Sequence, residues 1–124
     1  MWDCVDQCPI LDHFANASSA IDVRFVDRDD CGSLQDELSV CGGARVPAVI
    51  FLSEDGFPVG RYGDRTLSRY RQMALQQFGP SYPIGGSGAT EDPLRSVVQD
   101  WLNEFERIQL ILRTSPRLRR KHGD

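Results

Sequence analysis

The sequence predicts an α/β protein in which helices flank a mixed sheet and a further helix follows at the C-terminal end. Three observations support this class: apolar residues at helical spacing near the start, an apolar hairpin in the middle, and a long amphipathic stretch near the end. A strand-like segment lies between helical ones before the hairpin, an order typical of a sheet covered by helices. With 124 residues and 40% hydrophobic content, the chain suits one domain with a buried core.

The first two predicted elements are a helix over about 3–18 and a strand over about 22–27. Leu11 and Phe14 fall at helical spacing, and Pro9 is expected to kink the second turn because it lacks an amide hydrogen. The segment IDVRFVD is rich in β-branched and aromatic residues. Its apolar positions are dense enough for a mostly buried strand.

The clearest local signal is a hairpin within RVPAVIFLSEDGFPVGRYG. The apolar run before Asp55-Gly56 predicts a buried strand, and the Asp-Gly pair predicts the turn. Pro58 then requires the second strand to lie at a sheet edge. A short helix precedes the hairpin in SLQDELSV, and a longer one is expected over 66–78.

Composition narrows the functional classes. The formal net charge of −4 argues against nucleic-acid binding, and no run of 18 or more apolar residues predicts a membrane span. No signal peptide is visible, so we expect a cytoplasmic protein whose four cysteines are reduced, catalytic or metal-bound. His13 and His122 are the only histidines, which serves hydrolase triads poorly, and no phosphate-binding loop occurs. We expect no cofactor.

Cys4 and Cys8 are four residues apart, so a helix places both thiols on one face. This pair admits a redox site, a metal site or simple packing. The cysteine spacings lack the paired C-x₂-C of structural zinc sites, so we expect no metal. Cys31 lies among acidic residues and is interpreted as incidental, whereas Cys41 precedes Pro47, where it could approach Cys4 in space.

Several short motifs follow one another in a characteristic order. They are Asp3-Cys4, Pro9-Ile10-Leu11-Asp12, Val23-Arg24-Phe25-Val26-Asp27, Cys41-Gly42-Gly43-Ala44-Arg45-Val46-Pro47, and the hairpin glycines Gly56 and Gly63. Together, over roughly residues 4–78, they resemble the thioredoxin superfamily. The resemblance is closest to bacterial thioredoxin-like proteins with a W-C-x-D-C motif and a G-G-x-x-x-P loop.

The resemblance implies a fold, a chemistry and a set of site residues. It implies a thioredoxin-like sheet that lacks the first central strand and the first cysteine of the motif. Counting back from the family's kinking proline places Cys4 at the resolving cysteine, and the resemblance implies that Pro47 is cis and faces the site. Cys8 is a further candidate site residue because it follows Cys4 by one helical turn, although the resulting C-x-x-x-C spacing departs from the family's C-x-x-C. In such sites a helix N-terminus stabilises the attacking thiolate. The implied substrate is a disulfide-containing or thiol protein.

Two functions stay open on this basis. One is thiol–disulfide oxidoreductase activity with an incomplete or altered cysteine motif, in which Cys4 is the resolving thiol or a lone nucleophile. The other is a non-catalytic thioredoxin-like module that binds a protein beside Pro47 or through the last helix. Whether the chain is an enzyme is therefore open.

We expect four regions: a thioredoxin-like domain over 1–79, a linker over 80–92, a C-terminal amphipathic helix over 93–113 and a basic tail over 114–124. The apolar stripe of the C-terminal helix predicts either intramolecular packing or a homodimer. The tail carries four Lys and Arg side chains and is expected to be a solvated, frayed end.

Overall fold

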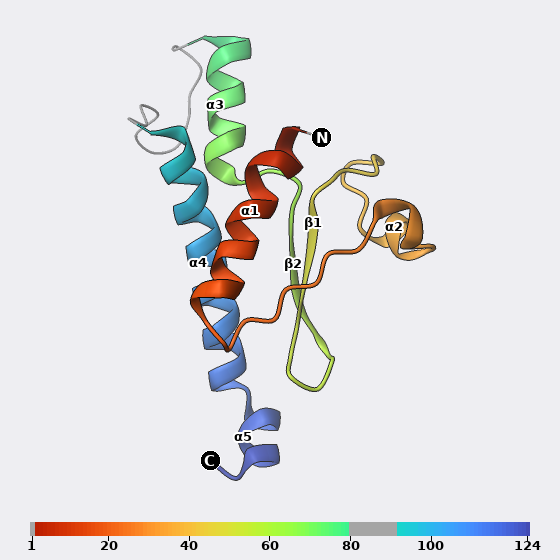
Figure 1. Cartoon of the computed structure of the whole chain (residues 1–124), viewed down its shortest axis with the longest axis vertical. Coiled ribbons are helices and arrows are strands. Elements are labelled where there is room, and N and C mark those ends of the chain that lie inside the picture. The colour runs from red at the N-terminus through yellow and green to blue at the C-terminus, as the bar shows by residue number, and fades with distance from the viewer. Residues whose placement is uncertain (1, 80–91) are drawn as a thin grey trace. The chain divides into compact units, whose positions relative to one another are not determined.

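The computed structural model describes residues 2–79 and 92–124, so the predicted linker lies, up to residue 91, outside the described residues (Figure 1). The elements in chain order are α1 (Trp2–Ala17), the 3₁₀ helix η1 (Arg28–Asp30), α2 (Leu34–Glu37), β1 (Ala48–Leu52), β2 (Pro58–Gly63), α3 (Leu67–Phe78), α4 (Pro93–Thr114) and α5 (Pro116–His122). None of the helices in the described part of the chain is long and apolar enough to cross a membrane.

The chain divides into two compact units. The first unit comprises residues 1–49 and 62–64, and the second comprises residues 50–61 and 65–124. The predicted α/β class is confirmed, with one antiparallel two-stranded sheet of β1 and β2 in the described residues and a long helix at the C-terminal end. The hairpin strands contribute residues to both units.

Helix α1 dominates the first unit. Ile10, Leu11 and Phe14 are buried, because they recur at the spacing that places side chains on one face of a helix. Pro9 lies inside α1 and is exposed, and the helix continues through it to Ala17. The ring removes one backbone donor from the helix, so the carbonyl of Val5 receives no helical hydrogen bond from residue 9.

The segment predicted as a strand over 22–27 is not a strand. It runs as an extended coil between α1 and η1 (Figure 1). Phe25 and Val26 are 57% and 67% exposed, so the expected burial is also absent. The reason is physical: a strand exists only where a neighbouring strand accepts and donates its backbone hydrogen bonds, and the described residues supply no such neighbour here.

The hairpin forms where the sequence predicts it. Its turn is closed by hydrogen bonds from Ser53 N to Phe57 O at 2.8 Å and from Gly56 N to Ser53 O at 3.0 Å. Gly56 has a φ of +86°, a conformation that glycine adopts without steric cost. Pro58 is the first residue of β2, one of the few positions where a strand tolerates proline.

The core of the second unit lies along α4. Asp92 caps this helix by accepting hydrogen bonds from the amides of Leu94 and Arg95. Trp101 is fully buried and Ile108 is 4% exposed, so the middle of the predicted apolar stripe is buried. Two further contacts join the hairpin and α3 to α4. Phe51 packs edge-to-face on Phe105 with ring centroids 5.2 Å apart, and Ser68 N donates to Asp100 Oδ2 at 2.8 Å.

The basic tail is not frayed, contrary to expectation. It forms α5, capped by Ser115, whose side chain accepts a hydrogen bond from Leu118 N, and Leu118 itself is buried. Its basic side chains bind the acidic hairpin turn. Arg117 and Lys121 pair with Asp55, and His122 Nε2 lies 2.6 Å from Glu54 Oε1. These contacts, which we call the tail clasp, hold the end of the chain in place.

Candidate redox site

The two candidate thiols lie one helical turn apart on α1. Cys4 and Cys8 are both half-buried, and both are free thiols. Burial raises the pKa of the Cys8 thiol, and the neighbouring sulfur of Cys4 raises it further through its charge and a hydrogen bond. Cys8 therefore keeps its proton at neutral pH, with Cys4 as the hydrogen-bond partner of that thiol.

Helix geometry limits what this pair can do. Side chains four residues apart on a helix have Cβ atoms about 5–6 Å apart, whereas a disulfide requires roughly 3.5–4.5 Å. A bond between Cys4 and Cys8 therefore requires the first turns of α1 to distort. The same spacing suits a sulfur–sulfur hydrogen bond without any backbone movement.

Gln7 ties the cysteine helix to the end of β2. Its side chain is 3% exposed, and Nε2 donates a hydrogen bond of 2.7 Å to the backbone carbonyl of Asp64. The two residues are 57 positions apart in the sequence and belong to the same compact unit. This buried bond fixes the orientation of the helical turn that carries both cysteines.

The Pro47 loop meets the same segment. Pro47 is buried and the Val46–Pro47 peptide bond is cis. Gly63 has a φ of +112°, and a Cβ placed on it would lie 2.5 Å from the carbonyl oxygen of Pro47. Arg45 Nη1 lies 3.3 Å from Asp64 Oδ2. The chain thus links Pro47 to α1 through Gly63, Asp64 and Gln7, all within the first unit.

The remaining cysteines lie elsewhere. The sulfur of Cys31, which is half-buried, donates to the carbonyl of Asp27 at 3.3 Å. Cys41 is exposed, has a φ of +50° and is a free thiol, so the option of a Cys4–Cys41 disulfide is not realised in this structure. Within residues 2–79 and 92–124, no three His, Cys, Asp or Glu side chains come together as a metal-binding group.

Sequence reasoning missed three residues of this site: Gln7, Arg45 and Asp64. A signal for Gln7 was present, because it falls at the spacing i, i+4, i+7 with Leu11 and Phe14. A polar residue on a buried helix face must find a hydrogen-bond partner. The hydrogen-bond partner of Gln7 could not be predicted from the sequence, because it is the backbone carbonyl of a distant residue, Asp64.

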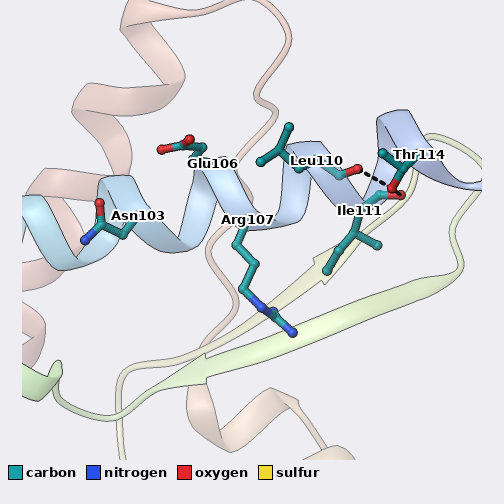
Figure 2. Close-up of a pocket in the computed structure, with 6 residues that line it drawn as sticks. All are labelled: Asn103, Glu106, Arg107, Leu110, Ile111 and Thr114. Carbon is teal, nitrogen blue, oxygen red and sulfur yellow. Dashed lines mark hydrogen bonds between the residues drawn. The ribbon is translucent and has the colours of Figure 1, made fainter.

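A separate hollow lies along α4, in the second unit (Figure 2). Its lining residues are Asn103, Glu106, Arg107, Leu110, Ile111 and Thr114. Leu110 is 55% exposed, and the Thr114 hydroxyl is occupied by donation to the Leu110 carbonyl at 2.7 Å. The hollow therefore combines the apolar side chains of Leu110 and Ile111 with four polar or charged ones.

A cysteine-bearing helix tied to a cis-proline loop, followed by a β-hairpin and a helix, defines a thioredoxin-like class of protein. A family model described as thioredoxin matches residues 2–75, which is more than half of the chain. The chain belongs to the thioredoxin family. No curated protein and no solved structure matched the chain significantly.

Proposed function

We propose that the protein exchanges thiols and disulfides, with Cys4 as the attacking sulfur and Cys8 as its hydrogen-bond donor. The observation that carries the proposal is the raised pKa of Cys8 beside Cys4, which leaves Cys8 protonated. A thiolate, not a thiol, is the nucleophile in these reactions. Cys8 is therefore less suited to attack, and we assign the attacking role to Cys4, which lies one turn before it on α1.

The reaction proceeds in three balanced steps. The Cys4 thiolate attacks one sulfur of a substrate disulfide, the substrate S–S bond breaks, and its second sulfur leaves as a thiolate. An external thiolate then attacks the Cys4 sulfur of the mixed disulfide, which releases the remaining substrate thiolate, and a second external thiolate attacks the external sulfur now bonded to Cys4 and releases the Cys4 thiolate. Because a Cys4–Cys8 disulfide requires distortion of α1, we assign these two thiols to external small thiols or a thiol protein, and they are oxidised to one disulfide as the substrate disulfide is reduced to two thiols.

Pro47 is proposed as the substrate-facing loop. The family resemblance implies that role, and the buried Gln7–Asp64 hydrogen bond and the Gly63–Pro47 approach support it by joining the loop to the cysteine helix. The substrate class is a disulfide-containing or thiol protein. An extended substrate backbone beside this loop would place its disulfide near Cys4.

Disulfide reduction tests the proposal directly. We expect the wild type with excess glutathione to reduce a disulfide-bonded model protein such as insulin, and Cys4→Ser to reduce it no faster than glutathione alone. Cys8→Ala should slow the exchange, whereas Cys8→Ser, which keeps a hydroxyl donor, should slow it less. Cys31→Ser is the matched control and should behave as the wild type. A wild type no faster than glutathione alone refutes the proposal.

The alternative function is a non-catalytic binding module. The adjacent apolar residues Leu110 and Ile111, 55% and 37% exposed in the α4 hollow, are the observation that favours it, because a contiguous apolar patch rimmed by polar residues is typical of a contact surface. Here the expected result is binding without exchange. A Leu110→Glu variant would then lose its partner while Cys4→Ser would retain it.

A further inference from the structure

The extended segment between α1 and η1 contains a stretch, from Asp22 to Val26, whose backbone groups are unused among the described residues. Among the described residues, Asp22 to Val26 make no backbone hydrogen bond, although the segment lies between elements that are well paired. Ile21 N bonds back to Ser18 O, and Asp27 O accepts from Asp30 N, so the pairing resumes immediately on either side. Five consecutive residues with unused donors and acceptors form a template for strand addition.

The side chains of this segment favour a strand. In extended backbone, alternate residues share a face. Ile21, Val23 and Phe25 therefore form an apolar face, and Asp22 and Arg24 lie together on the other. The second placement is visible in the structure, where Arg24 Nη2 lies 3.4 Å from Asp22 Oδ2. Both of these charged side chains are exposed, at 76% for Asp22 and 85% for Arg24.

We propose that this segment pairs antiparallel with the same segment of a second copy, about a two-fold axis through Val23. In that register each Asp22 stands opposite the partner copy's Arg24, and each Ile21 stands opposite its Phe25. This register therefore gives two pairs of opposite charges on one face and two apolar pairs on the other. Shifting the axis to Arg24 would instead place two arginines opposite each other, which disfavours that register.

The charge pattern of this segment favours pairing with the same segment of a second copy over pairing with an unrelated peptide. An isologous contact must be self-complementary, and the order acid, apolar, base about Val23 meets that condition. The first unit is acidic overall, but charges beyond about 8 Å are largely screened at physiological ionic strength. The facing Asp22–Arg24 pairs therefore set the register.

The contact is small. One strand pair buries less than the roughly 1,000 Å² that a stable interface needs, so the dimer forms reversibly and only at high protein concentration. Pairing converts the unused backbone groups into a ladder and covers Phe25, which is 57% exposed in the single chain. The inference goes beyond thiol exchange and does not depend on it.

Sedimentation velocity over a concentration series tests this dimer. We expect the wild type to shift from monomer to dimer with concentration, and Asp22→Arg or Arg24→Asp to stay monomeric because like charges then face each other. The double variant Asp22→Arg/Arg24→Asp restores complementarity and should dimerise. Mixing the two single variants should give a heterodimer, since one copy is then wholly basic and the other wholly acidic at these positions.

Two controls keep the result specific. Cys4→Ser should dimerise as the wild type, which separates this inference from the redox proposal. Leu110→Glu tests the α4 hollow, and it should leave the dimer unchanged. The inference is overturned if the wild type stays monomeric at every concentration, if the single charge variants dimerise normally, if the double variant fails to dimerise, or if Leu110→Glu alone abolishes the dimer.

Discussion

The two compact units differ in the contacts found inside each of them. The cysteine-bearing unit carries ten acidic and three basic side chains, and two polar contacts, the Gln7–Asp64 hydrogen bond and the Arg45–Asp64 ion pair, join segments that are distant in its sequence. The second unit carries eight acidic and eleven basic side chains, and it packs around Trp101 and Leu118, both almost completely buried.

This difference suggests separate roles for the two kinds of contact: apolar burial stabilises the fold, and directional polar contacts position the candidate site. Apolar burial is non-directional and tolerates small shifts, whereas a buried hydrogen bond fixes position and is costly when one partner is lost. The second unit therefore supplies stability through its core. The first unit uses a few directional contacts to hold two cysteines and a proline loop in a fixed arrangement.

The largest expected effect is in the core of the second unit. Trp101→Ala removes a fully buried side chain and should lower the free energy of unfolding by about 3–5 kcal/mol. Urea unfolding followed by circular dichroism measures it. Leu102→Ala changes the next residue along the helix, which is exposed, and should cost far less. Equal losses in both variants would show that Trp101 is not the centre of this core.

The next effect is at the Pro47 loop. Gly63→Ala places a Cβ against the Pro47 carbonyl and imposes a positive φ on alanine, which should destabilise the fold by on the order of 1–3 kcal/mol. Gly43→Ala is the matched control, because a Cβ there makes only ordinary contacts and φ lies outside the left-handed region. If Gly63→Ala melts at the wild-type temperature in differential scanning calorimetry, the close approach to Pro47 is not a constraint.

A comparable or smaller loss is expected at the tie between α1 and β2. Gln7→Ala leaves the buried Asp64 carbonyl without the Gln7 donor, at a cost of about 1–3 kcal/mol. Faster hydrogen exchange of the α1 amides would report it locally. The exposed Gln77→Ala in α3 serves as the reference. Unchanged exchange in α1 would contradict the role given to Gln7.

The smallest effect concerns acid stability. Arg117, Ser53 and Lys121 hold the pKa of Asp55 well below its usual range, and the hydrogen bond with His122 lowers the pKa of Glu54. Lowered pKa values mean that the unfolded chain binds protons before the folded chain does, so the contribution of the tail clasp is present above about pH 4 and falls as the pH drops further. Thermal melts from pH 6 to pH 2 should show a smaller decline in Asp55→Asn than in the wild type. Equal declines of the melting temperature in the two proteins would show that the tail clasp does not contribute to acid sensitivity.

Regular elements were predictable where local pattern decides them. The periodicity of Leu11 and Phe14 predicted α1, the Asp55-Gly56 pair predicted the hairpin turn, and the apolar stripe over 93–113 predicted α4. The strand over 22–27 was wrong because residue types indicate only the propensity for a strand, while its existence requires a partner. α5 was missed because its charges are neutralised by a turn that lies some sixty residues earlier.

The site was predictable only in part. The thiol pair followed from the Cys4–Cys8 spacing, and its position on one helix follows from α1. The different roles proposed for the two thiols could not be predicted from the spacing, because they depend on the burial that raises the pKa of Cys8. The role of Asp64 was equally hidden, since its backbone carbonyl is the group that binds Gln7.

Site-resolved alkylation tests the central claim most directly. The wild type is treated briefly with iodoacetamide between pH 6 and pH 9, and fragmentation of the tryptic peptide over residues 1–24 assigns the label to Cys4 or Cys8. We expect Cys4 to be modified first at neutral pH, and Cys8 to react appreciably only toward the alkaline end, because its thiol holds the proton. Modification of Cys8 before Cys4, or at an equal rate across the range, would contradict the assignment of Cys4 as the attacking sulfur.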